Sequence, residues 1–400
     1  LGLGLAVIEL EYYRTATNPT MVPILAFLSL RWLDRPVRFV IFGGIGVLLI
    51  LVGIWGANHA LLKPFEKSGK PLLDTIHSYR RRERGVNVVV IGGGHGQATL
   101  LRGLKQYTHN ITAIVTVADT GGSSGDLRRN LGVLPPGDIR NCLAALSSDE
   151  ALLSQVFQYR FKSGTGLEGH SLGNLLITAL GEITGSFEEA VMESGKVLAI
   201  YGQVLPSTLT NVQLVGELED PETGEIRRIV GESELTNTPG RIHRVWLDPA
   251  NTPAYPPAIS AILNADLILI GPGSLFTSLL PNLLVGGLAD AIQSSRAEKY
   301  FICNVATERG ETEGFNASDH LKVIEQHLGR DLFDLVICNR NFRGKLGANA
   351  EWVVADMVLH ENYKVYEADL IDETYPWRHD SQKLAKAIIN LFEERTGPLL

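Results

Sequence analysis

The sequence predicts an α/β protein with a Rossmann-like, doubly wound, mostly parallel sheet and an antiparallel β insertion, preceded by a transmembrane helix. Three observations support this prediction. From about residue 86 onward, short β-branched apolar runs alternate with helical patterns, as buried parallel strands alternate with crossover helices. Glycine-rich loops follow several of these runs. Ahead of them, residues 39–57 form one long apolar run without a formal charge.

Residues 1–38 are expected to hold the end of a first apolar helix and a loop. The run at residues 1–10 (LGLGLAVIEL) resembles the tail of an apolar helix that starts earlier in the protein. Together with residues 39–57 it would form a membrane hairpin, with the intervening loop outside the cell.

Residues 39–57 (FVIFGGIGVLLILVGIWGA) are predicted to be a transmembrane helix. As a helix this run spans about 28 Å, close to the thickness of the bilayer hydrocarbon core. Trp55 lies near its end, and Arg35, Arg38 and Lys63 flank it as interfacial anchors would. A buried core helix is the alternative, but the run is long and apolar all round. A cleaved signal peptide fits badly, because no small-residue cleavage site follows.

Residues 58–85 are predicted to be a basic linker. Residues 1–84 contain eleven Lys or Arg and six acids, a net charge of +5; the whole chain carries −8, which leaves −13 for the remainder. The basic residues that follow the apolar run indicate an inner or plasma membrane protein whose globular domain lies in the cytoplasm, although Arg31, Arg35 and Arg38 lie just before the run. The acidic charge of the residues after 84 argues against nucleic acid as a partner, because phosphate backbones bind clustered Lys and Arg side chains.

The globular domain is expected to occupy residues 86–400. Residues 86–91 and 111–117 read as strands around a helix at 97–107, which makes a right-handed βαβ unit. Further strands are predicted at 267–270, 300–303 and 335–338, and a closing amphipathic helix at 381–394. Residues 211–247 show alternation and turn signals, which predicts the antiparallel insertion. The three cysteines show no metal-ligand spacing, as in an ordinary reduced cytoplasmic protein.

Ligands of open α/β sheets bind beyond the carboxyl ends of the strands, and four loops rich in glycine and small polar residues are expected there. The first contains Gly92, Gly93, Gly94 and Gly96 ahead of a helix, where backbone amides can approach a phosphate. It matches the dinucleotide fingerprint imperfectly, and a structural turn would use glycines too. His95 is interpreted as an ordinary loop residue.

The second loop begins with Asp119 at the end of the second strand. Asp119 could hold a ribose hydroxyl, help to hold Mg²⁺ beside phosphates, or only cap a turn. The residues after it look like a second anion cradle: Gly121, Gly122, Ser123 and Ser124.

The third group of candidates follows Pro135-Pro136-Gly137. Asp138 could be a helix N-cap or a site residue, and Arg140 beside Asn141 offers a planar fork for phosphate or carboxylate. Downstream, His170 and Asn174 flank another helix start, and His170 is either a proton carrier or a satisfied buried histidine.

The fourth loop is a strand-to-helix turn of the phosphate-cradle type, with Gly271, Gly273, Ser274 and Thr277. Asn304, Thr307 and Glu311 follow the next strand at a similar height. The sequence has no Walker A motif and no H-E-x-x-H motif, which argues against those enzyme classes.

In this order the loops resemble the YvcK/CofD-like family, whose bacterial branch is known as the gluconeogenesis factor. The blocks that carry the resemblance are IGGGHG, ITAIVTVADTGGSSGDLR, LPPGDIRNCLAAL, YRF, GHSLGNLLITAL, GPGSLFTSLLPNLLV and NVATERGETEG. The match runs from about residue 87 to residue 338 and is expected to continue to the C-terminus. Thr120 stands where the family usually has a second acid, His95 where it often has Thr, and ATERGET replaces a T-Q-x-G-E-T pattern.

The resemblance implies a Rossmann-like cytoplasmic domain. Its bacterial branch implies binding of UDP-linked N-acetylhexosamines and a role in cell shape and cell-wall synthesis during gluconeogenic growth. The related transferase branch implies transfer of a phospholactyl group from a guanosine diphosphate carrier to a deazaflavin, with Mg²⁺.

Three functions therefore stay open, and a membrane-tethered nucleotide-sugar binding protein is favoured. In it, the glycine and serine loops contact phosphates, Arg140 faces the diphosphate, and Asp119 or Asn304 holds a sugar hydroxyl. A Mg²⁺-dependent phospholactyl transferase is the alternative, with Asp119, Asp138 and His170 as catalytic candidates and Asp119 as the candidate metal ligand. An NAD-linked oxidoreductase ranks third. No cofactor is certain, and a homodimer is a further expectation.

Overall fold

A computed structural model describes residue 27, residue 30 and residues 32–62, 82–83, 85–148, 152–347 and 350–397. The chain forms two compact units, Leu1–Arg80 and Arg81–Leu400. The predicted apolar segment at residues 1–10 lies outside the described residues, as does most of the predicted linker at 58–85.

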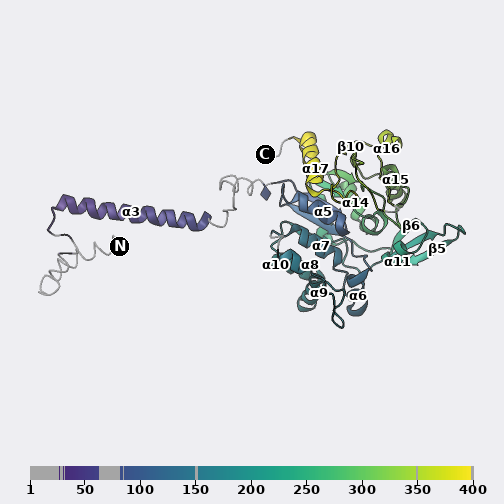
Figure 1. Ribbon diagram of the computed structural model, residues 1–400, viewed down its shortest axis with the longest axis horizontal. Helices are drawn as coiled ribbons and strands as arrows, with labels where there is room; N and C mark the ends of the chain where they lie inside the picture. Colours follow the sequence, from purple (N-terminus) through teal and green to yellow (C-terminus); the bar gives the residue numbers. More distant parts are fainter. Residues whose placement is uncertain are drawn as a thin grey trace. The chain divides into compact units, whose positions relative to one another are not determined.

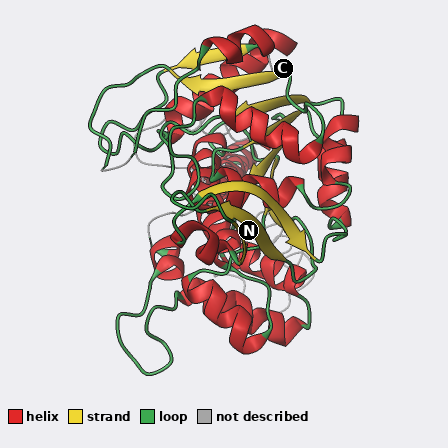
Figure 2. Cartoon of the chain, turned by 90° about the vertical axis from the view of Figure 1, so that its right-hand side faces the viewer, coloured by secondary structure: helices red, strands yellow, loops and turns green. Residues whose placement is uncertain are grey.

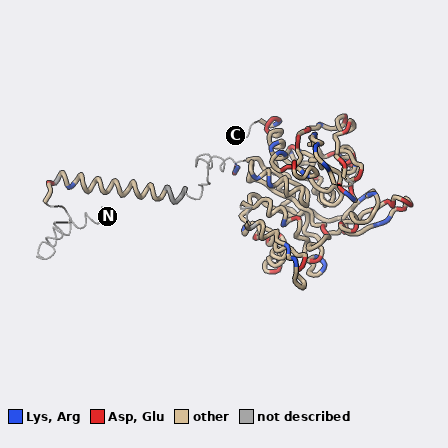
Figure 3. The backbone as a smooth tube through the Cα atoms, in the orientation of Figure 1, with Lys and Arg blue, Asp and Glu red and all other residues tan. Residues whose placement is uncertain are grey.

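In the first unit, helix α3 (Arg35–Leu62) contains the predicted apolar run (Figure 1). Its stretch Pro36–Ala57 is the one described helix that is long and apolar enough to cross a bilayer. None of its most apolar window is buried against protein, and most of its length carries no charged side chain (Figure 3). A soluble core helix would bury such a surface, so α3 lacks the packing that a core helix needs.

The second unit is built on a seven-stranded parallel sheet in the order β10-β9-β8-β7-β1-β2-β3, with helices beside it (Figure 2). The strands are β1 (Val88–Gly92), β2 (Ile111–Val115), β3 (Gln203–Pro206), β7 (Leu267–Ile270), β8 (Glu298–Ile302), β9 (Leu335–Asn339) and β10 (Val365–Ala368). From β1 the order runs outward in both directions, which makes the junction of β1 and β7 the topological switch point. The doubly wound fold predicted from the sequence is confirmed.

Apolar strands explain why the sheet is covered on both faces. All five residues of β1 and of β9 are buried, so their sequences are continuous apolar runs rather than alternating ones. The larger helices are α5 (Gly94–Leu104), α6 (Gly122–Leu131), α7 (Gly137–Leu146), α9 (Leu172–Thr184), α10 (Phe187–Val197), α15 (Ala317–Leu328) and α17 (Ser381–Thr396). Helix α5 packs against both α7 and α17.

Shorter helices complete the unit: α8 (Leu153–Gln158), α12 (Pro256–Leu263), α13 (Leu280–Leu283), α14 (Leu288–Ser294) and α16 (Met357–Asn362). A π-helical turn, η2 (Leu275–Leu279), follows the fourth predicted loop. The helix predicted at 97–107 begins three residues earlier, because the loop glycines themselves enter its first turn.

The predicted insertion is a separate antiparallel sheet in the order β5-β4-β6. Its strands are β4 (Gln213–Glu219), β5 (Ile226–Val230) and β6 (Arg241–Asp248), and α11 (Glu232–Asn237) lies between the last two. This element matters for the site, because the first residue of α11 reaches the loop after β2.

Candidate functional site

A cleft of about 610 Å³, here called the main cleft, lies at the carboxyl ends of β1, β7 and β8. Its volume is in the range of about 300–1,000 Å³ that small-molecule sites occupy. The loops after β1, β7 and β8 and the segment before α17 supply most of its lining, and Asp119, Asp138 and Glu232 add to it. The predicted site residues among them are Gly93, Gly94, Gly96, Asp119, Asp138, Gly273, Ser274, Asn304 and Thr307.

Two glycine loops meet backbone to backbone in the main cleft. A Cβ at Gly96 would lie 2.5 Å from the carbonyl oxygen of Pro272, so only glycine permits this approach. Asn304 fixes the second loop, since its amide accepts from the Gly273 N–H (3.2 Å) and donates to the Gly273 carbonyl (3.0 Å). Asn304 therefore positions this loop with both ends of its amide.

Gln97 occupies the place where the dinucleotide fingerprint would have its last glycine. Its buried amide donates to the carbonyl oxygens of Val90 (2.9 Å) and Ile114 (3.0 Å), which ties α5 to β1 and β2. The departure from the fingerprint is thus a structural replacement that leaves the first loop and the start of α5 in place.

A second, smaller pocket of about 260 Å³ lies beside the main cleft, and we call it the small pocket. The predicted residues that line it are Asp119, Gly121, Gly122, Ser123, Ser124, Asp138, Arg140, Asn141 and Asn174, together with Arg160. The four loops predicted from the sequence are therefore brought together, but they divide between two pockets. Only Asp119 and Asp138 line both.

Three carboxyl groups interact at the pockets: Asp119 and Asp138 line both pockets, and Glu232, from the insertion, lines the main cleft. Burial is the main cause that raises the pKa of Asp138 to about 7, and the negative charge of Asp119 adds to it. A hydrogen bond from the Gly94 N–H acts in the opposite direction. Burial likewise raises the pKa of Glu232 to about 9, helped by the charge of Asp119 and a hydrogen bond shared with it. Near neutral pH, Glu232 holds a proton and Asp138 is close to its midpoint.

Glu232 also explains how Thr120 is accommodated. The Thr120 N–H donates to Glu232 Oε2 (3.2 Å), and the Thr120 hydroxyl accepts from the Ser233 N–H (3.2 Å). The insertion thus supplies a carboxyl group beside Asp119, that of Glu232, although residue 120 is not an acid.

Two further acids lie on the other side of the main cleft. Glu308 lines it, and burial raises the pKa of Glu308. Glu311 lies behind it, accepting from the Thr277 hydroxyl (2.8 Å) and the Phe276 N–H (3.0 Å), while burial raises its pKa to about 8. Thr277 therefore binds Glu311 and does not line either pocket.

The segment before α17 contributes Trp377, Arg378 and His379 to the main cleft. Burial lowers the pKa of His379 to about 4, so its ring is neutral, and its Nε2 has no hydrogen-bond partner among the described residues. Burial also lowers the pKa of His95, and the positive charge of Arg378 is the second cause.

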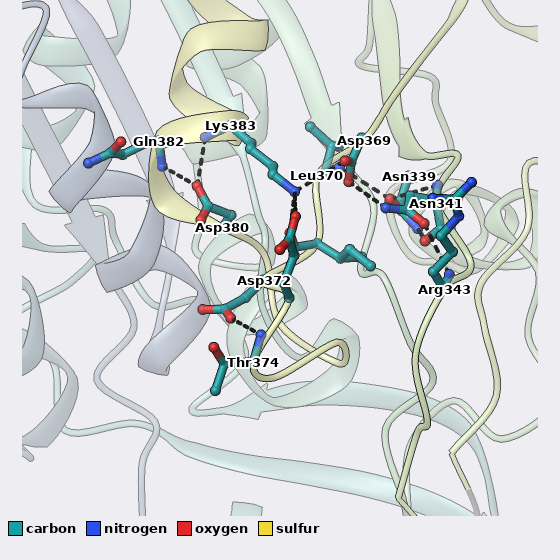
Figure 4. A network of polar contacts seen from close by, with 12 residues as sticks. Asn339, Asn341, Arg343, Asp369, Leu370, Asp372, Thr374, Asp380, Gln382 and Lys383 are labelled. Carbon is teal, nitrogen blue, oxygen red and sulfur yellow. Dashed lines mark hydrogen bonds and ion pairs between the residues drawn. The ribbon is translucent and has the colours of Figure 1, made fainter.

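A polar network holds this segment in place (Figure 4). The Asn339 side-chain oxygen accepts from the Leu370 N–H (3.2 Å) and the Asn341 N–H (3.1 Å). Lys383 donates to Asp369 and to the Ile371 carbonyl, both at 3.1 Å. The network joins the ends of β9 and β10 to α17, so it positions the three residues at the cleft.

Not every predicted residue lies on a pocket surface. Gly92 ends β1 and Gly271 begins the loop after β7, and neither lines the two pockets. His170 binds the Ser123 hydroxyl through Nδ1 (2.9 Å) and so contacts the small pocket through Ser123. Within the described ranges, no three His, Cys, Asp or Glu side chains are grouped as metal ligands.

Sequence reasoning missed Glu232, Glu308, Arg160, Arg378 and His379. Glu232 lies in a strand-rich insertion that carries no glycine loop. The segment Trp377–Asp380 gave one usable signal, because charged and aromatic residues are concentrated just ahead of a helix start.

Comparison with known proteins now identifies the fold family. Residues 88–396 match the family described as 2-phospho-L-lactate transferase CofD. The chain belongs to the CofD family. The family resemblance inferred from the sequence is confirmed, and it implies a nucleotide-related ligand.

The relatives of this CofD-family chain include proteins named gluconeogenesis factor. One from Halalkalibacterium halodurans is 45% identical over 76% of this chain and 95% of its own length. One from Bacillus subtilis is 42% identical over 77% and 98%. A Nostoc relative is 47% identical over 88% of this chain and 78% of its own.

A solved structure is similar as well. The crystal structure of a UPF0052 family member from Bacillus halodurans is 44% identical, with a TM-score of 0.70, and the match covers 76% of this chain and 99% of that one.

Proposed function

We propose that this CofD-family protein binds a nucleotide sugar, a UDP-linked N-acetylhexosamine, in the main cleft, and that it is a membrane-tethered regulator of cell shape and wall synthesis under gluconeogenic growth. The observation that carries the proposal is the meeting of two glycine loops at the switch point. Gly96 and Gly273 bring backbone from the ends of β1 and β7 together, as a diphosphate cradle requires.

Electrostatics of the main cleft support a ligand of modest negative charge. The protonated Glu232 and Glu311 reduce the repulsion that an all-ionised set of acids would exert on a diphosphate. Arg378 supplies positive charge, and the neutral His379 ring and the Glu308 carboxyl group offer polar atoms to sugar hydroxyls and the acetamido group. In this proposal Asp119 holds a hydroxyl, and Asn304 acts by positioning Gly273.

The proposed tether is α3. The Nostoc relative matches 88% of this chain, whereas residues 81–400 are 320 of the 400 positions, so that match extends into the first unit. The basic residues after the apolar run support a cytoplasmic globular unit.

The alternative is a Mg²⁺-dependent phospholactyl transferase that uses a guanosine diphosphate carrier. The observation that favours it is the closeness of Asp119 and Asp138, whose mutual repulsion a cation would relieve. Mg²⁺ is often held by one or two carboxylates plus substrate phosphates, so these two residues fit it. The metal would supply charge neutralisation of the phosphates, while Asp138, near its midpoint, could move a proton.

Calorimetric titration of the full chain in detergent micelles separates the two. We expect UDP-N-acetylglucosamine to bind without conversion, and a guanosine diphosphate conjugate and NAD to bind weakly or not at all. If only the guanosine diphosphate conjugate binds, and its binding requires Mg²⁺, the result would instead support the transferase function.

A further inference from the structure

The small pocket has the features of an anion site in its own right. Its floor is the start of α6 (Gly122–Leu131), a helix of ten residues whose N-cap, Gly121, has no side chain to bind the first amides. Free amides at a helix start favour a negative charge. A helix start alone is not a site, so the surrounding side chains decide the matter.

Two buried side chains of the small pocket have unused hydrogen-bonding atoms. Arg140 is 8% exposed; its Nη1 donates to Ser171 Oγ (2.5 Å) and its Nη2 to Asn141 Oδ1 (2.9 Å), but its Nε has no partner. Asn174 is 1% exposed; its amide donates to Ser123 Oγ (3.0 Å), but its Oδ1 has no partner. Buried polar atoms without partners are rare in native proteins.

Charge gives a third, independent indication. Arg140 and Arg160 both line the small pocket, and no carboxylate in the described part of the chain forms an ion pair with either. Burial is the largest cause that lowers the pKa of Arg140, and the charge of the nearby Arg160 is the second. Asp119 and Asp138 line the same pocket and act on the Arg140 pKa in the opposite direction, so the two guanidinium groups favour an anion most when Asp138 is protonated.

We propose that the small pocket is a second ligand site, separate from the main cleft, which binds a phosphate-type oxyanion against the start of α6 and between Arg140 and Arg160. Asn174 Oδ1 would accept a hydrogen bond from a protonated oxygen of that anion, and Asp138, which faces both pockets, would lie beside it. The volume of about 260 Å³ falls below the usual range for a drug-sized ligand, so a phosphate or a small phosphate monoester fits better than a nucleotide. This inference goes beyond the proposed function and does not depend on it.

The test uses the full chain in detergent micelles, titrated with inorganic phosphate and, in a parallel arm, with glycerol phosphate. Arg160→Gln removes one charge from an exposed side chain, and it should weaken phosphate binding about ten-fold or more, as expected for a lost charge-assisted hydrogen bond. Arg129→Gln is the matched control, because Arg129 is an exposed arginine in the last turn of α6 that does not line the small pocket; it should leave phosphate binding unchanged. Asn174→Asp, an isosteric change, should abolish binding by placing a second negative charge against the anion.

A final arm repeats the phosphate titration with UDP-N-acetylglucosamine present at saturation. Phosphate binding that persists there, and that Arg160→Gln still weakens, supports a separate site; tighter binding of the ester than of phosphate would identify a phosphorylated small molecule as its occupant. Displacement of phosphate by the UDP-sugar would overturn the inference, since the small pocket would then hold the diphosphate itself. Equal loss in the two arginine variants, or no phosphate binding at millimolar concentration, would overturn it too. If the UDP-sugar fails to bind while phosphate binds through Arg160, the proposed function fails and this inference stands.

Discussion

At the scale of single residues, Asp138 links the two pockets. It lines both, and its pKa of about 7 means that its charge changes across the physiological range. Because the folded-state pKa lies above the ordinary value of 3.8, the folded protein binds more protons than the unfolded chain between about pH 4 and pH 7, so Asp138 lowers stability as the pH rises through that window. In the folded protein the carboxyl group itself ionises near pH 7.

We therefore predict that affinity for an anionic ligand falls between pH 6 and pH 8, because ionised Asp138 repels it. Asp138→Asn should flatten that pH dependence and keep the affinity near its pH 6 value. Calorimetric titration of the two proteins with UDP-N-acetylglucosamine at several pH values measures this. An unchanged slope in the variant would assign the pH dependence to another group.

Gly96 provides a second prediction at this scale. Gly96→Ala places a methyl group against the Pro272 carbonyl, which should lower stability by about 1–3 kcal/mol and separate the two glycine loops. Gly181→Ala is the control, because Gly181 is also within a helix but its added Cβ would meet only Ala190 at 3.8 Å. The thermal midpoint of unfolding and the ligand affinity should both fall in Gly96→Ala and stay near normal in Gly181→Ala. Equal behaviour of the two would show that the loop approach is dispensable.

At the scale of elements, the sequence predicted those that local pattern determines. The continuous apolar runs of β1, β7 and β9 and the alternation at residues 211–247 identified the two sheets correctly. The edges were less accurate, since α5 starts at Gly94 rather than residue 97. Glu232 and His379 could not be assigned, because their place at the cleft depends on the docking of α11 and of the segment before α17, and no local pattern records that docking.

The segment between β10 and α17 provides the prediction at this scale. Asn339→Ala would leave the Leu370 and Asn341 N–H groups without their acceptor, at a cost of about 1–3 kcal/mol for each group that stays buried. The loss should lower the thermal midpoint and weaken ligand binding, because Arg378 and His379 would be held less firmly. Asn362→Ala is the control, since Asn362 makes one exposed hydrogen bond to Val358. Normal ligand affinity in the Asn339 variant would mean that the network does not serve the cleft.

At the scale of the whole molecule, the proposed function joins a binding domain to a membrane anchor. We predict that the full chain sediments with membranes and resists extraction by high salt, because α3 is inserted rather than held by charge. Leu49→Arg together with Val52→Arg puts two charges in the middle of α3 and should release the protein into the soluble fraction. Leu131→Arg, at an exposed leucine of the globular unit, should not. Release of the unaltered chain by salt would contradict the anchor.

In the proposed function, the two glycine loops of the main cleft cradle the diphosphate of a nucleotide sugar. The most direct measurement is a crystal structure of the protein with UDP-N-acetylglucosamine bound. We predict that the diphosphate lies against Gly94, Gly96 and Gly273, with the sugar toward His379. A diphosphate found between Arg140 and Arg160 instead, or a ligand outside the main cleft, would contradict the account.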